Sequence, residues 1–392
     1  MEEYRIQMDK QREIWIDWMR VFACFLVMIV HGTEPFYLGG DGALVLTRTD
    51  AFWVAFFDSL ARACVPLFVI ASSYLQFPIH FSTKEFLRRR AVRVLVPFLI
   101  WTVFYAFYWG EPITNFKGLL LNFNYAAGHL WFIYMLLGLY LLMPMLSPWA
   151  EKVGHRELLF YIGIWGLTTF IPYIREAASG GEQLLIRAED GLPAAALFPL
   201  WGEASWNPFG LLYYFSGFIG YMLLGLYLKK FTTMWSRGKS LAVGLPALVA
   251  GFAISAVGFY RRILVSAGGV FPVSGDVSLA TGWETAVTFN TPGVALMALG
   301  WVLLFRQIHC DGGFYRKVLL PVSNAGYGMY LIHMIVLALA SGWIRDWLGI
   351  GCDAVWVTPL EIILTAVCTF IPVAIAAVLL RKIPRVGKWL MG

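Results

Sequence analysis

Charge is scarce in this sequence. Of its 392 residues, only 14% are Asp, Glu, Lys or Arg, whereas 59% are hydrophobic and 17% are aromatic. Soluble globular domains carry about 25% charged residues, so the composition excludes an ordinary soluble domain. We expect instead an all-α polytopic membrane protein that packs as one transmembrane domain over residues 1–392, with membrane lipids as neighbours and no nucleic-acid partner.

Cysteine is also scarce, and the familiar catalytic motifs are missing. The five cysteines form no CxxC pair and no cluster with histidine, so neither a disulfide framework nor a metal site is expected. The sequence contains no P-loop, no GxGxxG after a strand, no GxSxG and no HExxH. These absences remove the support for nucleotide hydrolysis, dinucleotide redox chemistry, serine esterase activity and zinc peptidase activity.

Long hydrophobic runs, by contrast, recur along the whole chain. No small-residue cleavage site follows the first run, so we predict a retained span rather than a signal peptide. Ten runs have a length adequate to cross a bilayer. They lie near residues 15–32, 52–76, 94–109, 129–146, 157–173, 211–228, 242–260, 287–305, 325–343 and 359–380.

Lysine and arginine alternate between the loops that connect these runs. One set of loops, which includes both chain ends, carries 21 of these cations, and the alternating set carries 7. Positively charged loops stay in the cytoplasm, so this distribution predicts that both termini are cytoplasmic.

The first run carries ionisable residues that a membrane span normally avoids. Arg20 and His31 are eleven positions apart, which on a helix is about 16 Å and close to three turns, so both project from one face. Asp17 and Glu34 each lie three residues from one of these bases, within side-chain reach. Two interpretations stay open: Asp17 and Arg20 pair at the headgroups while His31 reaches the far interface, or the charged face is functional.

Other ionisable residues also fall inside the predicted spans. His129 begins the fourth span in the stretch GHLWF, and His333 lies in the middle of the ninth, and for both a site role and a structural role are open. Asp58 and Arg62 are four residues apart on the second span, which favours a structural ion pair, although such pairs often border polar cavities.

The densest group of cations is the segment KEFLRRRAVR, residues 84–93. The positive-inside rule alone predicts a cationic cluster here, and anionic lipid is a ready partner for it. Five cations in ten residues exceed what orientation requires. Because arginine binds phosphate well, a phosphorylated cytoplasmic cofactor is the second interpretation.

Segments spread along the chain resemble the acyltransferase family 3 integral-membrane proteins. IDWMRVFACFLVMIVH resembles the family's first-helix pattern, in which an arginine precedes a histidine by ten intervening residues, as Arg20 precedes His31 here. VPLFVIASSYL resembles the second-helix stretch, and LRRRAVRVLVPFLIW resembles the basic segment that precedes a proline. GHLWFIYMLLGLYLLMP and NAGYGMYLIH resemble the fourth-helix and ninth-helix signatures.

The sequence departs from the family pattern at two places. Ser72 and Ser73 stand where the family has Ser-Gly, and Leu136 stands where many members carry a glutamate in the tryptophan-led motif that begins here at Trp131. The hydrophobic variant of this motif resembles the branch that acetylates bacterial surface polysaccharides or their lipid-linked precursors. That resemblance implies a multi-pass protein of the bacterial inner membrane.

The resemblance also implies an activity and roles for individual residues. It implies an O-acetyltransferase that takes acyl-CoA, usually acetyl-CoA, from the cytoplasm and acylates a hydroxyl of a glycan or lipid-linked saccharide. By carry-over His31 is the catalytic residue and Arg20 its partner in the motif, while Arg90 and Arg93 match the segment expected to hold the phosphates of coenzyme A. Supporting roles are expected for residues near this machinery: Glu34, Asp17, His129 and Trp131.

Two competing functions remain at this level. Ten spans also allow two inverted repeats of five, as in secondary transporters of small polar or anionic solutes. Against this, the sixth span carries no counterpart of Asp17, Arg20 and His31. A non-catalytic sensor or scaffold leaves the intramembrane charges without a role. The acceptor, the length of the acyl group and the oligomeric state are left open.

Overall fold

The computed structural model describes residues 12–39, 42–108, 128–178, 201–202, 207, 209–348 and 357–392. Of the described residues, 81% are helical, which confirms the all-α prediction. Within them, eight helical segments are long and apolar enough to cross a membrane, so this is a multi-pass membrane protein. The α-helices are α2 (Ile14–Thr33), α3 (Arg48–Ala61), α4 (Cys64–Gln76), α5 (Thr83–Arg90), α6 (Val96–Tyr108), α8 (Trp131–Lys152), α9 (His155–Ala178), α10 (Ile219–Phe231), α11 (Arg237–Ala267), α12 (Val277–Glu284), α13 (Pro292–Phe305), α14 (Leu320–Leu348), α15 (Val357–Arg381) and α16 (Gly387–Met391).

Two of the ten predicted spans are too short in the structure to cross a bilayer as single helices. The sixth, predicted at 211–228, is a 3-10 helix (Gly210–Phe215) followed by a break and the 13-residue α10. The break contains Gly217 with φ +75°, a conformation that suits glycine and ends the 3-10 turn. The eighth, predicted at 287–305, is only the 14-residue α13, because Pro292 occupies its first turn. Helices of this length rise about 20 Å, short of the roughly 30 Å hydrocarbon core.

Three other helical segments contain a local irregularity. The second predicted span is divided between α3 and α4 at residues 62–63. The third predicted span runs from α5 into α6 through a π-helical turn, Ala91–Leu95, and a matching turn, Tyr315–Leu319, precedes α14. Pro97 and Pro321 follow these turns, and a proline ring clashes with the carbonyl four residues earlier, so the helix widens there.

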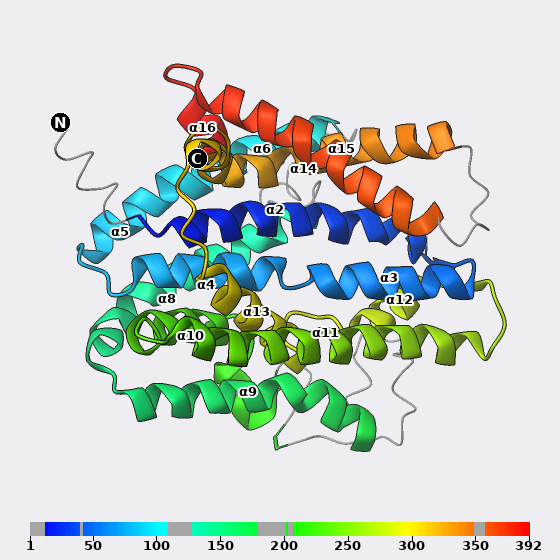
Figure 1. The fold of residues 1–392 in the computed structure, drawn as a ribbon, viewed down its shortest axis with the longest axis horizontal. Coiled ribbons are helices and arrows are strands. Elements are labelled where there is room, and N and C mark those ends of the chain that lie inside the picture. Colours follow the sequence, from blue (N-terminus) through cyan, green and yellow to red (C-terminus); the bar gives the residue numbers. More distant parts are fainter. Residues whose placement is uncertain are drawn as a thin grey trace.

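Helix α2 is at the centre of the bundle (Figure 1). It packs against α3, α4, α13, α14 and α15. Its side chains are therefore covered along most of their length, and Met19, Leu26 and Met28 are fully buried. The helix that carries the charged face predicted from the sequence is thus surrounded by protein rather than by lipid.

Helices α11 and α13 form the most extensive helix pair because glycines face each other across it. A Cβ atom on Gly251 would lie 2.5 Å from the carbonyl oxygen of Gly293, and one on Gly300 would lie 2.7 Å from the carbonyl oxygen of Gly244. Small residues let backbones approach closely where lipid provides no hydrophobic driving force. The seven-residue spacing on both helices places these glycines on one face.

The described residues also include one small antiparallel sheet. Its strands are β1 (Leu38–Gly39), β2 (Gly42–Val45) and β3 (Val273–Gly275), in the order β1-β2-β3. The register pairs Val45 with Val273 and Ala43 with Gly275. The sheet thereby ties the segment after α2 to the segment after α11.

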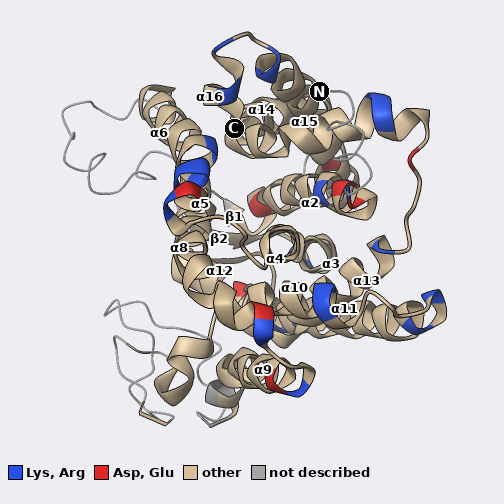
Figure 2. Ribbon diagram, turned by 90° about the vertical axis from the view of Figure 1, so that its left-hand side faces the viewer, with Lys and Arg blue, Asp and Glu red and all other residues tan. Residues whose placement is uncertain are grey.

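Lysine and arginine residues gather at one end of the bundle. The start of α2, α5, the start of α9, the end of α10 and α16 all lie at one end (Figure 1). Figure 2, which faces this end, shows Lys and Arg on α5 and near α16. We call this the basic end, and the end with the small sheet the opposite end. The loops of the cation-rich set therefore meet in space, as their alternation along the sequence predicts.

Candidate functional site

Three histidines that are distant in the sequence lie side by side. His31 is on the last turn of α2, His129 is in the 3-10 turn (Gly128–Leu130) that leads into α8, and His333 is in the middle of α14. The ring centroids of His31 and His333 are 5.3 Å apart, and those of His129 and His333 are 5.2 Å apart. We call this the histidine cluster. The sequence singled out each member but could not show that they meet.

His31 is oriented by Glu34. Its Nδ1 lies 2.9 Å from Oε2 of Glu34, and the chain stays helical there because α2 runs directly into a 3-10 turn, Glu34–Phe36. A carboxylate only accepts hydrogen bonds, so Nδ1 carries the proton and Nε2 keeps its lone pair. The two side chains are 19% and 29% exposed, so both stay accessible. The predicted pairing of His31 with Glu34 is confirmed.

His333 is fully buried and is also held in one orientation. Its Nδ1 lies 2.5 Å from the carbonyl oxygen of Tyr330, so Nδ1 donates and Nε2 again keeps its lone pair. The hydroxyl of Tyr330 donates to the carbonyl oxygen of His129. Tyr330 therefore links His333 to His129. The ring of Tyr105 packs edge-on against His129, with 4.9 Å between the ring centroids.

A buried ion network lies beside His31 toward the opposite end. Arg62 donates to Asp58 at 2.7 Å, as the four-residue spacing predicts. It also donates to Glu284 of α12 at 2.7 Å and to the hydroxyl of Tyr37 at 2.9 Å. Thr33, next to His31 and Glu34 on the chain, donates to Asp58 at 3.1 Å. The network joins α2, α3 and α12 and fixes the end of α2 that carries His31.

Replacing Arg62 with Leu is expected to destabilise the protein by about 3–5 kcal/mol, because Asp58, which is fully buried, would lose its compensating charge. Thermal unfolding in detergent micelles measures the change. Arg88 of α5 pairs with Glu85 at 3.0 Å but is 67% exposed, so Arg88→Leu is the matched control with an expected change of about 0–1 kcal/mol. Equal losses in the two variants would contradict a structural role for the Arg62 network.

The side-chain partners of Asp17 differ from Arg20, the neighbour that the sequence suggested. Its carboxylate accepts from Arg12 at 2.6 and 2.8 Å, from Tyr315 at 2.7 Å and from Ser323 at 2.6 Å. Arg12 lies before α2, Tyr315 begins the π turn that precedes α14, and Ser323 is in the first turn of α14, so none of these partners is Arg20. Asp17 is fourteen residues from His31, about 21 Å along the helix, so it anchors the basic end of α2 and is not part of the histidine cluster.

Four arginines converge at the basic end. Arg12, Arg20 and Arg93 lie within electrostatic range of Arg381, the last residue of α15. Asp17 neutralises Arg12, whereas Arg20, Arg93 and Arg381 make no ion pair with any residue in the described ranges. We call these three residues the arginine cluster. Sequence reasoning assigned Arg381 only to membrane topology, because it is remote in sequence from the other two.

Arg90 lies next to this cluster against aromatic rings. Its guanidinium is 5.2 Å from the ring centroid of Phe86 and 5.4 Å from that of Tyr140, and its Nε is buried without a hydrogen-bond partner in the described part of the chain. Tyr140 is within 3.2 Å of the Ser72 hydroxyl. Ser73 donates to the carbonyl oxygen of Met222 on α10 at 2.5 Å. Polar side chains therefore extend from Arg90 into the bundle.

Trp131 belongs to a different surface. Its ring stacks on Phe289 at 5.5 Å and packs near Phe218 at 6.0 Å, and it is 36% exposed. No ring contact joins it to the histidine cluster in the described residues. Trp131 therefore lies near Phe218, which directly precedes α10, and near Phe289, which lies shortly before α13.

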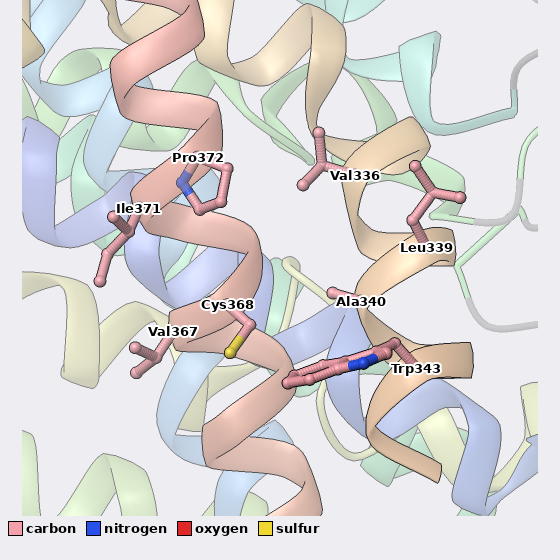
Figure 3. A pocket seen from close by; sticks show the side chains of 8 residues that line it. All are labelled: Val336, Leu339, Ala340, Trp343, Val367, Cys368, Ile371 and Pro372. Carbon is pink, nitrogen blue, oxygen red and sulfur yellow. The ribbon is translucent and has the colours of Figure 1, made fainter. Parts of the chain in front are cut away.

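An apolar groove lies between α14 and α15 (Figure 3). Val336 and Trp343 of α14 and Cys368 and Pro372 of α15 are among the residues that line it. It contains no carboxylate, imidazole or cation, so acid–base chemistry has no basis there. The other cysteines with described positions, Cys24, Cys64 and Cys310, are free thiols, and Cys352 lies outside the described residues.

The described residues contain no group of histidine, cysteine or carboxylate side chains arranged to hold a metal ion. The candidate site consists of an oriented imidazole near one end of the central helix α2 and arginines without an ion pair in the described residues near its other end, an arrangement suited to group transfer. The chain matches the acyltransferase domain family over residues 13–380 and belongs to acyltransferase family 3. It is therefore a membrane acyltransferase. No curated protein and no solved structure matches it.

Proposed function

We propose that this protein transfers an acyl group, by default acetyl, from cytoplasmic acyl-CoA to a hydroxyl of a cell-surface glycan or a lipid-linked saccharide. The observation that carries the proposal is the layout of α2, which presents Arg20 to the arginine cluster at one end and His31, oriented by Glu34, at the other. A group moved between the two sides of a membrane needs contacts of this kind at both ends of one element. The bacterial inner membrane is the proposed location.

The donor is proposed to bind at the basic end, with that end facing the cytoplasm. Coenzyme A carries several phosphate groups, and arginine forks bind phosphate through paired, charge-assisted hydrogen bonds. Arg93 and Arg381 are exposed and unpaired within the described residues, and Arg90 continues toward the bundle interior. These residues would hold the phosphates, and the pantetheine arm would extend along α2 toward His31.

His31 is proposed as the general base. Its Nε2 takes the proton from the acceptor hydroxyl as the oxygen attacks the thioester carbonyl carbon. The C–S bond breaks, the thiolate of coenzyme A leaves, and the proton on Nε2 passes to that sulfur. Glu34 keeps Nδ1 protonated and stabilises the imidazolium while it exists.

A covalent route uses the same nitrogen. In that route Nε2 attacks the thioester carbonyl carbon, the C–S bond breaks, and coenzyme A leaves as the thiolate, which takes a proton from water. The acceptor hydroxyl oxygen then takes the acyl group from the histidine and releases its proton to water, which restores the neutral imidazole. It suits a donor and an acceptor that reach His31 from opposite ends. Single-turnover labelling with radioactive acetyl-CoA distinguishes the routes, because only the covalent one leaves label on the protein before acceptor is added.

Purified protein in liposomes, supplied with labelled acetyl-CoA on one side, tests the function. We expect label to move to hydroxyl acceptors, together with release of coenzyme A on the side of the arginine cluster. Export of an unmodified solute without release of coenzyme A would instead support a transporter. Mass spectrometry of surface glycans from cells with and without the protein identifies the acceptor.

A further inference from the structure

Two buried imidazole nitrogens in the histidine cluster have no hydrogen-bond partner. They are Nε2 of His129 and Nε2 of His333, and neither has a hydrogen-bond partner among the described residues. An unsatisfied buried polar atom costs about 1–3 kcal/mol, so such atoms are uncommon. Here two of them belong to neighbouring rings 5.2 Å apart.

The structure also determines what kind of partner the His333 nitrogen requires. Because Nδ1 of His333 donates to the Tyr330 carbonyl, Nε2 of the neutral ring is a hydrogen-bond acceptor. Its partner must therefore bring an O–H or N–H group. Tyr330 also binds the backbone of His129, so the two histidines are held in fixed positions relative to each other.

The location of this pair connects it with the chemistry. His333 lies 5.3 Å from His31, ring centroid to ring centroid, whereas Glu34 engages His31 through Nδ1. A molecule whose hydroxyl reaches Nε2 of His31 therefore brings its neighbouring groups close to His333 and His129. His129 and His333 therefore lie beside His31, but the proposed proton transfer at Nε2 of His31 does not require them.

We propose that His129 and His333 are specificity residues that bind hydroxyl groups adjacent to the one being acylated, so that the acceptor is a polyol such as a sugar ring. This inference rests on the proposed function. A sugar presents neighbouring O–H donors on one face, which matches two adjacent unsatisfied nitrogens. A secondary amide of the pantetheine arm offers a single N–H, and a carboxylate or fully ionised phosphate offers no donor.

The test uses the full-length protein in liposomes with acetyl-CoA and three kinds of probe: methyl glucoside and methyl galactoside, their monodeoxy derivatives, and 1-propanol. We expect His333→Phe and His129→Phe each to raise the KM for the methyl glycosides about tenfold, the effect of one lost hydrogen bond of about 1.4 kcal/mol. The KM for acetyl-CoA and the acceptor-free hydrolysis of acetyl-CoA are expected to stay unchanged.

Two comparisons separate specificity from a structural role. His333→Gln keeps an acceptor oxygen near the position of Nε2 and is expected to recover most of the glycoside affinity. For the wild-type protein, a monodeoxy glycoside that lacks the hydroxyl next to the acylated one is expected to have a higher KM than the parent glycoside. For His333→Phe, the two glycosides are expected to have nearly the same KM. His155→Phe, at the start of α9 and outside the cluster, is the matched control.

The outcomes distinguish the inference from the function on which it rests. If His31-dependent release of coenzyme A occurs but the glycoside KM is unchanged in both Phe variants, the inference fails and the function stands. The inference also fails if hydrolysis and the KM for acetyl-CoA change as much as the glycoside KM, or if 1-propanol serves as well as the glycosides. Absence of any His31-dependent release removes both.

Discussion

Replacing His31 with Ala is expected to lower the rate of acyl transfer at least about 10²–10⁴-fold, the contribution of a positioned general base. The loss is complete if the histidine carries the acyl group. The reason is that Nε2 of His31 combines a free lone pair, an orienting carboxylate and partial exposure. Release of coenzyme A and acylation of the acceptor, both measured in liposomes, report the change.

The control for this variant must show that the protein still folds and inserts. His31 is partly exposed, so its truncation should cost little stability, and thermal unfolding and size-exclusion profiles should match the wild type. His155→Ala is the matched substitution outside the cluster. Glu34→Gln keeps an acceptor for Nδ1 but loses the charge, so an intermediate rate is expected. Substantial residual transfer by His31→Ala would refute its catalytic role.

Neutralising the arginines at the basic end is expected to raise the KM for acyl-CoA. A hydrogen bond to a charged group contributes about 1.5–3 kcal/mol, so the double variant Arg90→Gln, Arg93→Gln should raise the KM roughly 100-fold or more while kcat changes less. Arg381→Gln should act in the same direction, although nothing near it in sequence indicates this. Initial rates measured against acetyl-CoA concentration give both constants.

The controls use cations at the same end of the bundle that lie outside this group. Arg156, which is exposed near the start of α9, is a suitable control residue. The substitution Arg156→Gln removes one positive charge and should leave the KM for acyl-CoA unchanged. High salt should raise the KM of the wild type more than that of the double variant, because phosphate contacts are screened. A KM that stays at the wild-type value in the double variant would remove Arg90 and Arg93 from the donor site.

The sequence by itself determined the class of fold and the element that carries the chemistry. A low charged share and repeated apolar runs allow only a membrane bundle, because the bilayer demands long apolar helices. The eleven-residue spacing of Arg20 and His31 fixed their common helix face, and the local pairs His31–Glu34 and Asp58–Arg62 followed from spacings of three and four residues. Short-range geometry on a helix is readable from the chain alone.

Only the tertiary structure decided which distant residues meet. His129 and His333 join His31 through helix packing, and Arg381 joins Arg20 and Arg93 through the end of α15. The structure also shows that the carboxylate of Asp17 accepts hydrogen bonds from Tyr315 and Ser323 and is not paired with Arg20. Contacts between helices depend on crossing angles and on which faces of distant segments come together, and a local spacing in the sequence determines neither of these.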